Sequence, residues 1–578
     1  MSLTAAMNIG RSALSASQIG IQVAGNNVAN VATPGYSRQI THFSPIGGSD
    51  PYSRLSTGRG VGVRDVLRQV DTALQSRLWL SNSDRAAAQQ NLDLMTQVES
   101  VLGELSGNDL SSELSAFFNA WSERANNTQS SATVVQQGDK LAGMFQRLRS
   151  NLTTMRGQID RQLGGAVEAA DGLLSQIADL NSAVSAAELS GGSANSLRDQ
   201  RDQLISELSQ LVDVSVVDRQ NGAVDVLVGS TPVVLAGKSR GLTLKHVANG
   251  SNVDTTVAVR DDGEPLAATG GKISALLASR QTAVDGTIQR LDAVASQLIF
   301  QVNKLHSTGA NQTNLTRSVG SLAITAGDRT RAINDPANQT FGSLPFAATH
   351  GGFSVRVKNL ADGSFQSVRV NVDLDGLTAA GTPGTADDTT AEDIRASLDA
   401  VAGVNATFNA DGRLEVTADA GFEFSFTDDT SGALAVLGLN SYFTGTNAAD
   451  IACREDLKTD PSKLMSGRFT SAGLVQNATA LDMVALQDLS NAALGGRSIR
   501  QGWIDAVQVV GIRTAAADSQ NQALAVVQES LEAQRAAISG VSIDEEAVNL
   551  LNYQRQYQGA ARVISVADEL MQTLLAMV

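Results

Sequence analysis

The two ends of this chain carry apolar stripes with the spacing of paired helices, and these stripes constrain the fold more than any other feature. Near the N-terminus the apolar residues follow steps of three and four at Leu3, Met7, Leu14, Ile21, Ala24, Val28 and Val31. Gly10 and Ser17 fill the remaining positions and weaken this stripe. At the C-terminus the spacing is unbroken through Leu550, Tyr553, Tyr557, Ala560, Ile564, Ala567, Met571, Leu574 and Val578. This spacing is typical of coiled coils, so we expect a helix at each end.

A helix that reaches the last residue of a chain frays unless it packs against something. The two terminal helices can bury their stripes on each other, as an ordinary pair within one chain, or on neighbouring copies of the chain. The pattern alone does not separate these alternatives. Ser542 followed by Glu545 resembles a capping box and predicts where the C-terminal helix begins. Pro34 and Gly35 predict the turn that ends the N-terminal helix.

Between the two ends the periodicity changes several times along the chain. Helical spacing recurs at 67–105, 141–163, 173–184, 197–211, 271–306 and 470–538, whereas 41–63 is rich in Gly, Ser and Pro and predicts loop or short strand. Short β-branched runs between glycines at 212–262 predict a β-meander or a set of hairpins. Within 320–450 short runs such as 353–357, 368–372 and 422–426 alternate apolar and polar residues and predict strands, with one helix predicted near 390–402.

We therefore expect a multi-domain, mainly α protein with inserted α+β and β-rich parts. Residues 1–40 and 541–578 would pair as a terminal coiled-coil assembly domain. Residues 41–319 and 455–540 would form a long helical-bundle middle domain with a β-hairpin region near 212–262. Residues 320–454 would form an outer inserted α+β domain.

Charge and hydropathy exclude several classes of function. The net charge of −16 repels nucleic-acid phosphates, so we expect no nucleic-acid binding. No stretch reaches the 18 or so apolar residues of a membrane span, so we expect no membrane insertion. The start, MSLTAAMNIG, lacks the basic and apolar regions of a cleaved signal peptide. The single cysteine, Cys453, forms no internal disulfide and is interpreted as a small buried side chain.

The sequence contains few candidates for catalytic or nucleotide chemistry. Gly237-Lys238-Ser239 resembles the end of a phosphate-binding loop, but Pro232 stands where that motif needs its first glycine. The four histidines are scattered without ligand spacing, and no hydrolase motif occurs. We therefore expect no catalytic residues and no cofactor, and predict that the protein is not an enzyme.

One acidic segment matches part of a calcium-binding loop. Its first, third, fifth and sixth positions are occupied by Asn371, Asp373, Asp375 and Gly376. The twelfth position is Thr382 rather than a bidentate Glu, and no flanking helix pair is evident. We favour a solvated acidic turn over weak calcium binding, and expect no metal site.

Two longer segments resemble a known family. Residues 8–38 read NIGRSALSASQIGIQVAGNNVANVATPGYSR, and residues 542–575 read SIDEEAVNLLNYQRQYQGAARVISVADELMQTLL. They resemble the N-terminal and C-terminal signatures of the flagellar axial proteins, the group of rod, hook and hook-associated proteins. Thr33-Pro34-Gly35-Tyr36-Ser37-Arg38 and Tyr553-Gln554-Arg555-Gln556-Tyr557 look most like the hook-associated proteins of the hook–filament junction. The alternatives are a hook or distal rod subunit, or an unrelated enzyme or adhesin whose terminal helices are coincidental.

The resemblance implies a structural protein of the bacterial flagellum, exported by the flagellar type III route and located outside the cell. Both ends would be unfolded in the exported monomer and would pair only in the assembled tube. Its implied partners are other copies of itself, the hook protein and the second junction protein, hook-associated protein 3. A flagellar export chaperone would bind the C-terminal helix.

The residues expected at the assembly interface fall into two groups. The apolar group, whose alternative role is a plain intramolecular core, comprises Leu3, Met7, Leu14, Ile21, Val28, Leu550, Tyr553, Tyr557, Ile564, Met571 and Leu574. The second group follows the N-terminal helix and comprises Asn26, Asn27, Asn30, Thr33, Gly35 and Tyr36. Its asparagines would satisfy backbone or neighbouring-subunit polar groups, or would simply cap the helix C-terminus.

Overall fold

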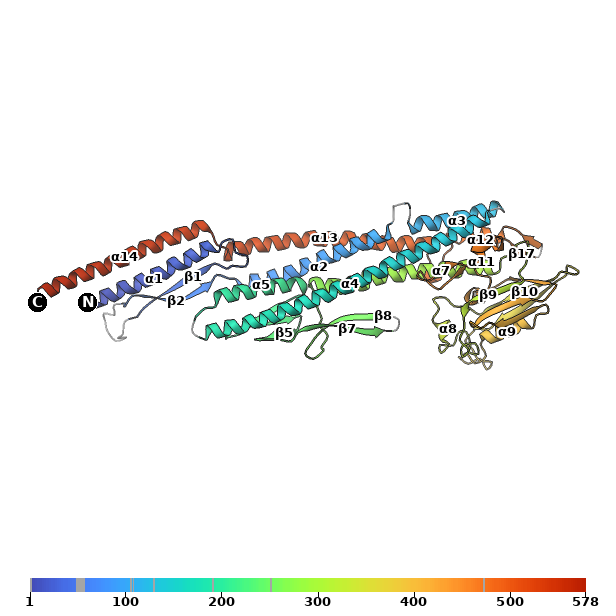
Figure 1. The fold of residues 1–578 in the computed structure, drawn as a ribbon, viewed down its shortest axis with the longest axis horizontal. Helices are drawn as coiled ribbons and strands as arrows, with labels where there is room; N and C mark the ends of the chain where they lie inside the picture. Colours follow the sequence, from blue (N-terminus) through green and yellow to red (C-terminus); the bar gives the residue numbers. More distant parts are fainter. Residues whose placement is uncertain are drawn as a thin grey trace. The chain divides into compact units, whose positions relative to one another are not determined.

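The computed structural model describes residues 3–47, 58–103, 107, 109–127, 130–189, 192–249, 252–470 and 473–577. Helices dominate, and several small antiparallel sheets accompany them (Figure 1), which confirms the mainly helical class predicted from the sequence. The chain divides into two compact units. The first comprises Met1–Leu94, Ile159–Ser279 and Ala515–Val578, and the second comprises Met95–Gln158 and Arg280–Thr514.

The first unit contains the two terminal helices. α1 (Leu3–Ala29) and α14 (Ile543–Ala576) lie side by side (Figure 1). Ser542 is the N-cap of α14, as predicted, and its hydroxyl accepts a hydrogen bond from the backbone N–H of Glu545 at 3.4 Å. β1 (Gln39–Pro45) and β2 (Val61–Arg68) form an antiparallel ribbon against α1, where the sequence predicted loop or short strand.

The rest of the first unit combines helices with two small β-structures. The helices that lie wholly or partly in it are α2 (Thr72–Leu102), α4 (Ser131–Glu188), α5 (Asn195–Leu211), α6 (Gly271–Ser279) and α13 (Ile499–Ser539). The strands are β3 (Ser215–Asp218), β4 (Val224–Val228), β5 (Thr231–Leu235), β6 (Lys238–Ser239), β7 (Leu242–Asn249) and β8 (Asn252–Val259). They form a four-stranded meander and a separate β7–β8 hairpin, which confirms the structure predicted for 212–262.

α4 joins two helical runs that the sequence showed separately. It continues through Gly164 and Gly165, because no proline interrupts it and one face remains buried at Leu163, Val167, Ala170, Leu174 and Ile177. Asn181 of the same helix is fully buried and fastens the meander. Its amide nitrogen donates to the backbone oxygens of Val224 (2.7 Å) and Ala236 (2.6 Å).

The second unit contains a cluster of aromatic rings, two of which lie on helix α3 (Leu110–Asn126). Other helices of this unit include α7 (Gly286–Ser307), which a π-helical segment (Arg280–Asp285) precedes, and α12 (Ala478–Ala485). Phe117, Trp121, Tyr442 and Phe443 pack with ring centroids 4.6 to 6.4 Å apart. All four side chains are fully buried, so this cluster ties helix α3 to the segment around 442.

The prediction of continuous helix from residue 470 is wrong. The hairpin of β17 (Arg468–Thr470) and β18 (Gly473–Val475), helix α12 and a 3₁₀ turn (Ala492–Leu494) precede α13. Gly495 and Gly496 both adopt left-handed backbone angles, with φ of 66° and 82°. A right-handed helix cannot pass through two such residues, so α13 begins only at Ile499.

The inserted segment folds as two three-stranded antiparallel sheets with short helices. Its strands are β9 (Arg317–Ala323), β10 (Gly351–Asn359), β11 (Phe365–Val372), β12 (Val404–Phe408), β13 (Arg413–Ala418) and β14 (Phe422–Thr427), followed by β15 (Phe443–Thr444) and β16 (Ala452–Cys453). Its helices are α8 (Gln339–Gly342), α9 (Ala391–Asp399), α10 (Ala433–Leu437) and α11 (Glu455–Thr459), with a 3₁₀ turn at Pro461–Lys463. A capping box between Thr390 and Asp393 starts α9, in the place predicted from sequence.

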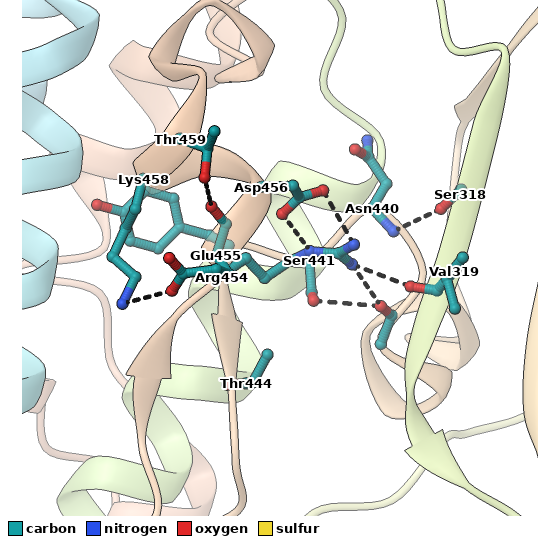
Figure 2. Close-up of polar contacts among 12 residues, drawn as sticks. Ser318, Val319, Asn440, Ser441, Thr444, Arg454, Glu455, Asp456, Lys458 and Thr459 are labelled. Carbon is teal, nitrogen blue, oxygen red and sulfur yellow. Dashed lines mark hydrogen bonds and ion pairs between the residues drawn. The ribbon is translucent and has the colours of Figure 1, made fainter. Parts of the chain in front are cut away.

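Arg454 joins the two ends of the inserted segment (Figure 2). Its guanidinium donates to the backbone oxygens of Val319 (3.1 Å) and Gly438 (3.3 Å) and pairs with Asp456 at 2.9 Å. Beside it, the backbone N–H of Asn440 donates to the Ser318 hydroxyl at 3.0 Å. Charge-assisted hydrogen bonds of this kind are stronger than neutral ones, so the inserted segment begins and ends at one fixed base within the second unit.

Candidate assembly site

The terminal helices pack antiparallel, and glycines mark their closest contacts. A Cβ atom on Gly10 would lie 2.6 Å from Cγ1 of Ile564, and a Cβ on Gly20 would lie 2.8 Å from the Tyr553 ring. Atoms do not approach this closely without displacement, so α14 rests directly on the bare backbone of α1 at both points. Gly10 adds no apolar side chain to the stripe, but it allows the two helices to pack closely at this point.

The residues that the pair buries completely are mostly small. On α1 they are Gly10, Ala16, Ser17, Gly20, Ala24 and Asn27, and on α14 they are Glu546, Ala560 and Ala567. The larger predicted interface residues are half-buried at Leu3, Met7, Leu14, Ile21, Val28, Leu550, Tyr553, Ile564 and Met571. Tyr557 and Leu574 remain 37% and 54% exposed. The pair within one chain therefore leaves much of its apolar stripe accessible.

A buried polar group holds the inner end of the pair, and we call it the polar clamp (Asn27, Tyr36, Arg38 and Glu546). Asn27 is 1% exposed, and its amide nitrogen donates to Glu546 Oε2 (3.1 Å) and to the backbone oxygen of Gln39 (2.9 Å). Asn27 Oδ1 accepts from the Gln39 N–H at 3.0 Å. One side chain thus joins α1, strand β1 and a carboxylate 519 residues further along the chain.

Arg38 and Tyr36 complete the clamp. Arg38 lies 2.7 Å from the carboxylates of both Glu546 and Glu545, and its backbone N–H donates to the Ser539 oxygen at 3.0 Å. The Tyr36 hydroxyl donates to Asn27 Oδ1 at 2.8 Å. Burial, together with the nearby charges of Asp199 and Glu546, raises the pKa of Tyr36 to about 12, so the hydroxyl keeps its proton at neutral pH.

The other predicted polar residues lie at the end of α1. The Asn30 amide nitrogen donates to the backbone oxygen of Asn26 at 2.9 Å, and the Thr33 hydroxyl donates to Asn30 Oδ1 at 3.2 Å. Asn30 thus binds the end of the helix, whereas Asn27 joins distant segments. Gly35 adopts a φ of 79°, which few residues other than glycine adopt readily.

The clamp contains two charged residues that the sequence prediction did not include. Arg38 and Glu546 lie in the segments that carry the family resemblance, but neither fits an apolar stripe. The available signal was the pairing of opposite charges. An arginine just after the N-terminal helix and a carboxylate in the first turn of the C-terminal helix must meet if the two helices pack antiparallel.

The acidic segment near 371–376 does not form a calcium-binding helix–loop–helix. Asn371 lies in strand β11, and Asp373 and Asp375 follow it on the surface. His350 lies beside them, 3.0 Å from Asp373, and the ligand atoms of these three residues lie within 4.8 Å of one another. All three side chains are exposed. Across the described ranges, no helix has the length and apolar character needed to cross a membrane.

Comparisons with known proteins identify the two ends and the middle of the chain. The family described as "Flagellar hook-associated protein FlgK helical domain" matches residues 95–319. "Flagella basal body rod protein" matches 7–36, and "Flagellar basal body rod FlgEFG protein C-terminal" matches 532–577. Paired terminal helices that carry the rod-protein signatures, with a helical domain between them, define a flagellar axial protein.

Full-length relatives narrow this class to one family. The chain is 24% identical to flagellar hook-associated protein 1 of Escherichia coli K12, over 99% of this chain and 100% of that protein. It is 25% identical to the Salmonella typhimurium protein of that name, with the same coverage, and 24% identical to the one from Bacillus subtilis, over 98% of this chain and 96% of that protein. Over nearly its whole length the chain is therefore similar to flagellar hook-associated protein 1, and its middle matches the helical-domain model of that family.

A solved structure supports the fold. "The structure of the flagellar hook junction protein FlgK from Burkholderia pseudomallei" matches with a TM-score of 0.51 at 15% identity, covering 80% of this chain and 100% of that chain. At this identity the match speaks for the fold alone.

Proposed function

We propose that this chain connects the hook to the filament of the bacterial flagellum by self-assembly through its terminal helix pair. The observation that carries this proposal is the half-buried stripe on α1 and α14, in a chain similar to flagellar hook-associated protein 1. Burying apolar area contributes about 25 cal/mol per Å². Packing against neighbouring copies would therefore supply the burial that the pair lacks, and would offset the cost of ordering its residues. The role is structural rather than catalytic.

Export would precede folding of the ends. The polar clamp joins residues 519 positions apart, so the pair cannot form until the whole chain is available. A chain whose ends stay unfolded can pass as a thread through a narrow channel and fold at its destination. A flagellar export chaperone would hold the stripe of α14 during export. At the junction it would contact the hook protein on one side and hook-associated protein 3 on the other.

The predicted domain division extends this proposal. Residues 1–40 with 541–578 would form the assembly domain, 41–319 with 455–540 the middle domain, and 320–454 the outer domain. The contact between Arg454 and Val319 supports a boundary at this place, because it closes the base of the inserted segment. The predicted interface residues from Leu3 to Leu574 are proposed to act in the first of these domains.

Deletion of the gene tests the function directly. We expect electron microscopy to show complete hooks without filaments, and an assay of the medium to show flagellin lost from the cell. Re-expression of the full chain serves as the control and restores filaments. Truncation before the hook is complete would make the chain a rod or hook component, and normal flagella would overturn the proposal.

A further inference from the structure

We propose that the C-terminal tip of α14 docks into an apolar hollow on the terminal pair of a second copy of this chain. The proposal rests on the self-assembly proposed above and specifies which surfaces meet. The hollow has a volume of about 410 Å³ and lies between the start of α1 and the second half of α14. Its apolar lining includes Leu3, Ala6, Gly559, Val563, Val566 and Leu570.

The hollow exists because small residues lie beside large ones. Ala6 and Gly559 leave space between the two helices, and three larger side chains of α14 border that space. Val563, Val566 and Leu570 are 47%, 49% and 52% exposed, and the described part of the chain does not cover them. Such a set of exposed apolar side chains favours a partner that is itself apolar.

The tip of α14 extends past the helix that partners it. Gly10 of α1 lies against Ile564 of α14. Because the helices are antiparallel, moving seven residues back along α1 and seven residues forward along α14 places Leu3 near Met571. The last turn of α14 therefore passes Leu3, the first described residue of α1. It carries three exposed apolar side chains, Leu574 at 54%, Leu575 at 73% and Met577 at 82%.

The tip cannot enter the hollow of its own chain. Val566 and Leu575 lie on one continuous helix, nine residues apart, which holds them about 13 Å apart along the axis. The hollow of a second copy is the matching acceptor, since each copy presents one tip and one hollow. A contact between two different surfaces of identical chains is heterologous and forms an open helical assembly rather than a closed dimer.

Charges beside the two surfaces are complementary. Arg562 lines the hollow and forms no ion pair with any described residue. Asp568 and Glu569 lie about two turns before the end of α14 and are likewise outside any ion pair between described residues. Opposite charges at the edge of an apolar contact set its orientation more than its strength, so Arg562 of one copy would face Asp568 and Glu569 of the next.

Irreversible cross-linking tests whether the two surfaces meet. The full chain carrying Val566→Cys and Leu575→Cys is expressed in cells that lack the gene, and isolated flagella are treated with a short bis-maleimide. We expect a ladder of covalent dimers, trimers and larger oligomers, because the contact is heterologous. The native Cys453 is buried and burial raises the pKa of its thiol to about 12, so it contributes little background. The matched control is Ser565→Cys with Leu575→Cys, which moves the first thiol to another exposed face of α14.

A charge exchange provides an independent readout that loss of folding does not imitate. We expect Arg562→Glu and Glu569→Arg each to reduce filament attachment by about tenfold, and the double variant to restore it. Restoration requires that the two residues face each other between copies, because within one helix they lie seven residues apart.

The outcomes separate this proposal from the function on which it rests. If the wild-type chain is missing from isolated flagella, the proposed function fails. If the wild-type chain is present but the cysteine pair gives no more ladder than its control, the docking proposal fails alone. Cross-linking of α14 to the export chaperone, or a covalent dimer without larger species, would also overturn it.

Discussion

The terminal pair and the inserted segment bury their side chains in different ways. In the inserted segment Phe353, Val355, Phe424 and Phe426 are 0% exposed and belong to one continuous core. In the terminal pair the fully buried residues are mainly glycine, alanine and serine, with Asn27 and Glu546 at one end. Full burial of a large apolar side chain contributes about 1.5–3 kcal/mol, so the inserted segment carries its own stability and the pair carries little.

In the terminal pair, the contacts that align the two helices are not the contacts that would stabilise them. The pair has two glycine contacts and one polar clamp, which fix how the helices align but supply little apolar burial. A fixed alignment with spare apolar surface suits a part that becomes stable only when neighbours cover it. The inserted segment has the opposite character, because its core is complete within one chain and its base is closed by Arg454.

The largest expected effect comes from a charge in the terminal stripe. Ile564→Asp places a carboxylate against Gly10, where it would lose its water on packing. We expect complete loss of incorporation into flagella, measured by immunoblot of isolated flagella, with the inserted segment still folded by circular dichroism. Ser565→Asp, on an exposed face, is the control and should incorporate. Normal filaments with Ile564→Asp would remove Ile564 from the interface.

The next largest effect lies in the core of the inserted segment. Phe424→Ala empties a fully buried site beside Phe426, whose ring centroid is 5.4 Å away. We expect the free energy of unfolding to fall by about 3–5 kcal/mol, measured by urea denaturation. Leu360→Ala, at a position 50% exposed, should cost far less. Equal effects of the two changes would contradict a self-sufficient core.

The buried His306 predicts how the stability of the region at the base of the inserted segment depends on pH. Burial, with the nearby positive charge of Arg454, lowers the pKa of His306 from 6.5 to about 4, while its ring accepts a hydrogen bond from the Met465 N–H at 3.1 Å. The unfolded chain binds a proton below pH 6.5 and the folded chain does not until about pH 4. The neutral, buried His306 therefore makes its full contribution to the free energy of unfolding above pH 6.5. That contribution falls by on the order of 2–3 kcal/mol as the pH drops to 4. His306→Gln should lose this dependence in urea titrations, and its persistence would assign the effect to another group.

Removing one charge from the polar clamp, without shortening a side chain, should weaken the terminal pair. Glu546→Gln keeps the shape but removes the charge that faces Arg38, leaving the guanidinium with Glu545 alone. We expect the free energy needed to open the terminal pair in assembled flagella to fall by about 2 kcal/mol. Proteolysis of the two ends should then be roughly 30-fold faster. Glu545→Gln, whose side chain is 62% exposed, should change the rate little. Equal rates for both variants would mean that the clamp does not hold the pair.

The smallest expected effect compares two glycines of α1. Gly20→Ala sets a methyl group 2.8 Å from the Tyr553 ring, whereas Gly25→Ala meets no atom within 4 Å. We expect Gly20→Ala to destabilise the pair by about 1–2 kcal/mol and Gly25→Ala to stabilise it by up to about 1 kcal/mol, by the same proteolysis assay. The opposite signs are the test, because a uniform effect of both changes would exclude close packing at Gly20.

The sequence by itself determined the terminal helices, the N-cap at Ser542, the β-structures in 212–262 and three strands of the inserted segment, β10, β11 and β14. These features depend on local periods of 3.6 and 2 residues and on turn residues, which a chain displays without any partner. The family resemblance likewise rested on residues visible in the sequence, and the full-length relatives confirmed it.

The tertiary structure decided what those helices touch. Gly10 and Gly20 became contact points, Arg38 and Glu546 became a buried pair, and Leu574 remained exposed. Periodicity gives the face of a helix but not its register against a helix more than 500 residues away. That register follows from which small residues allow two backbones to meet and from which buried charges must be paired, and both conditions exist only once distant segments lie together.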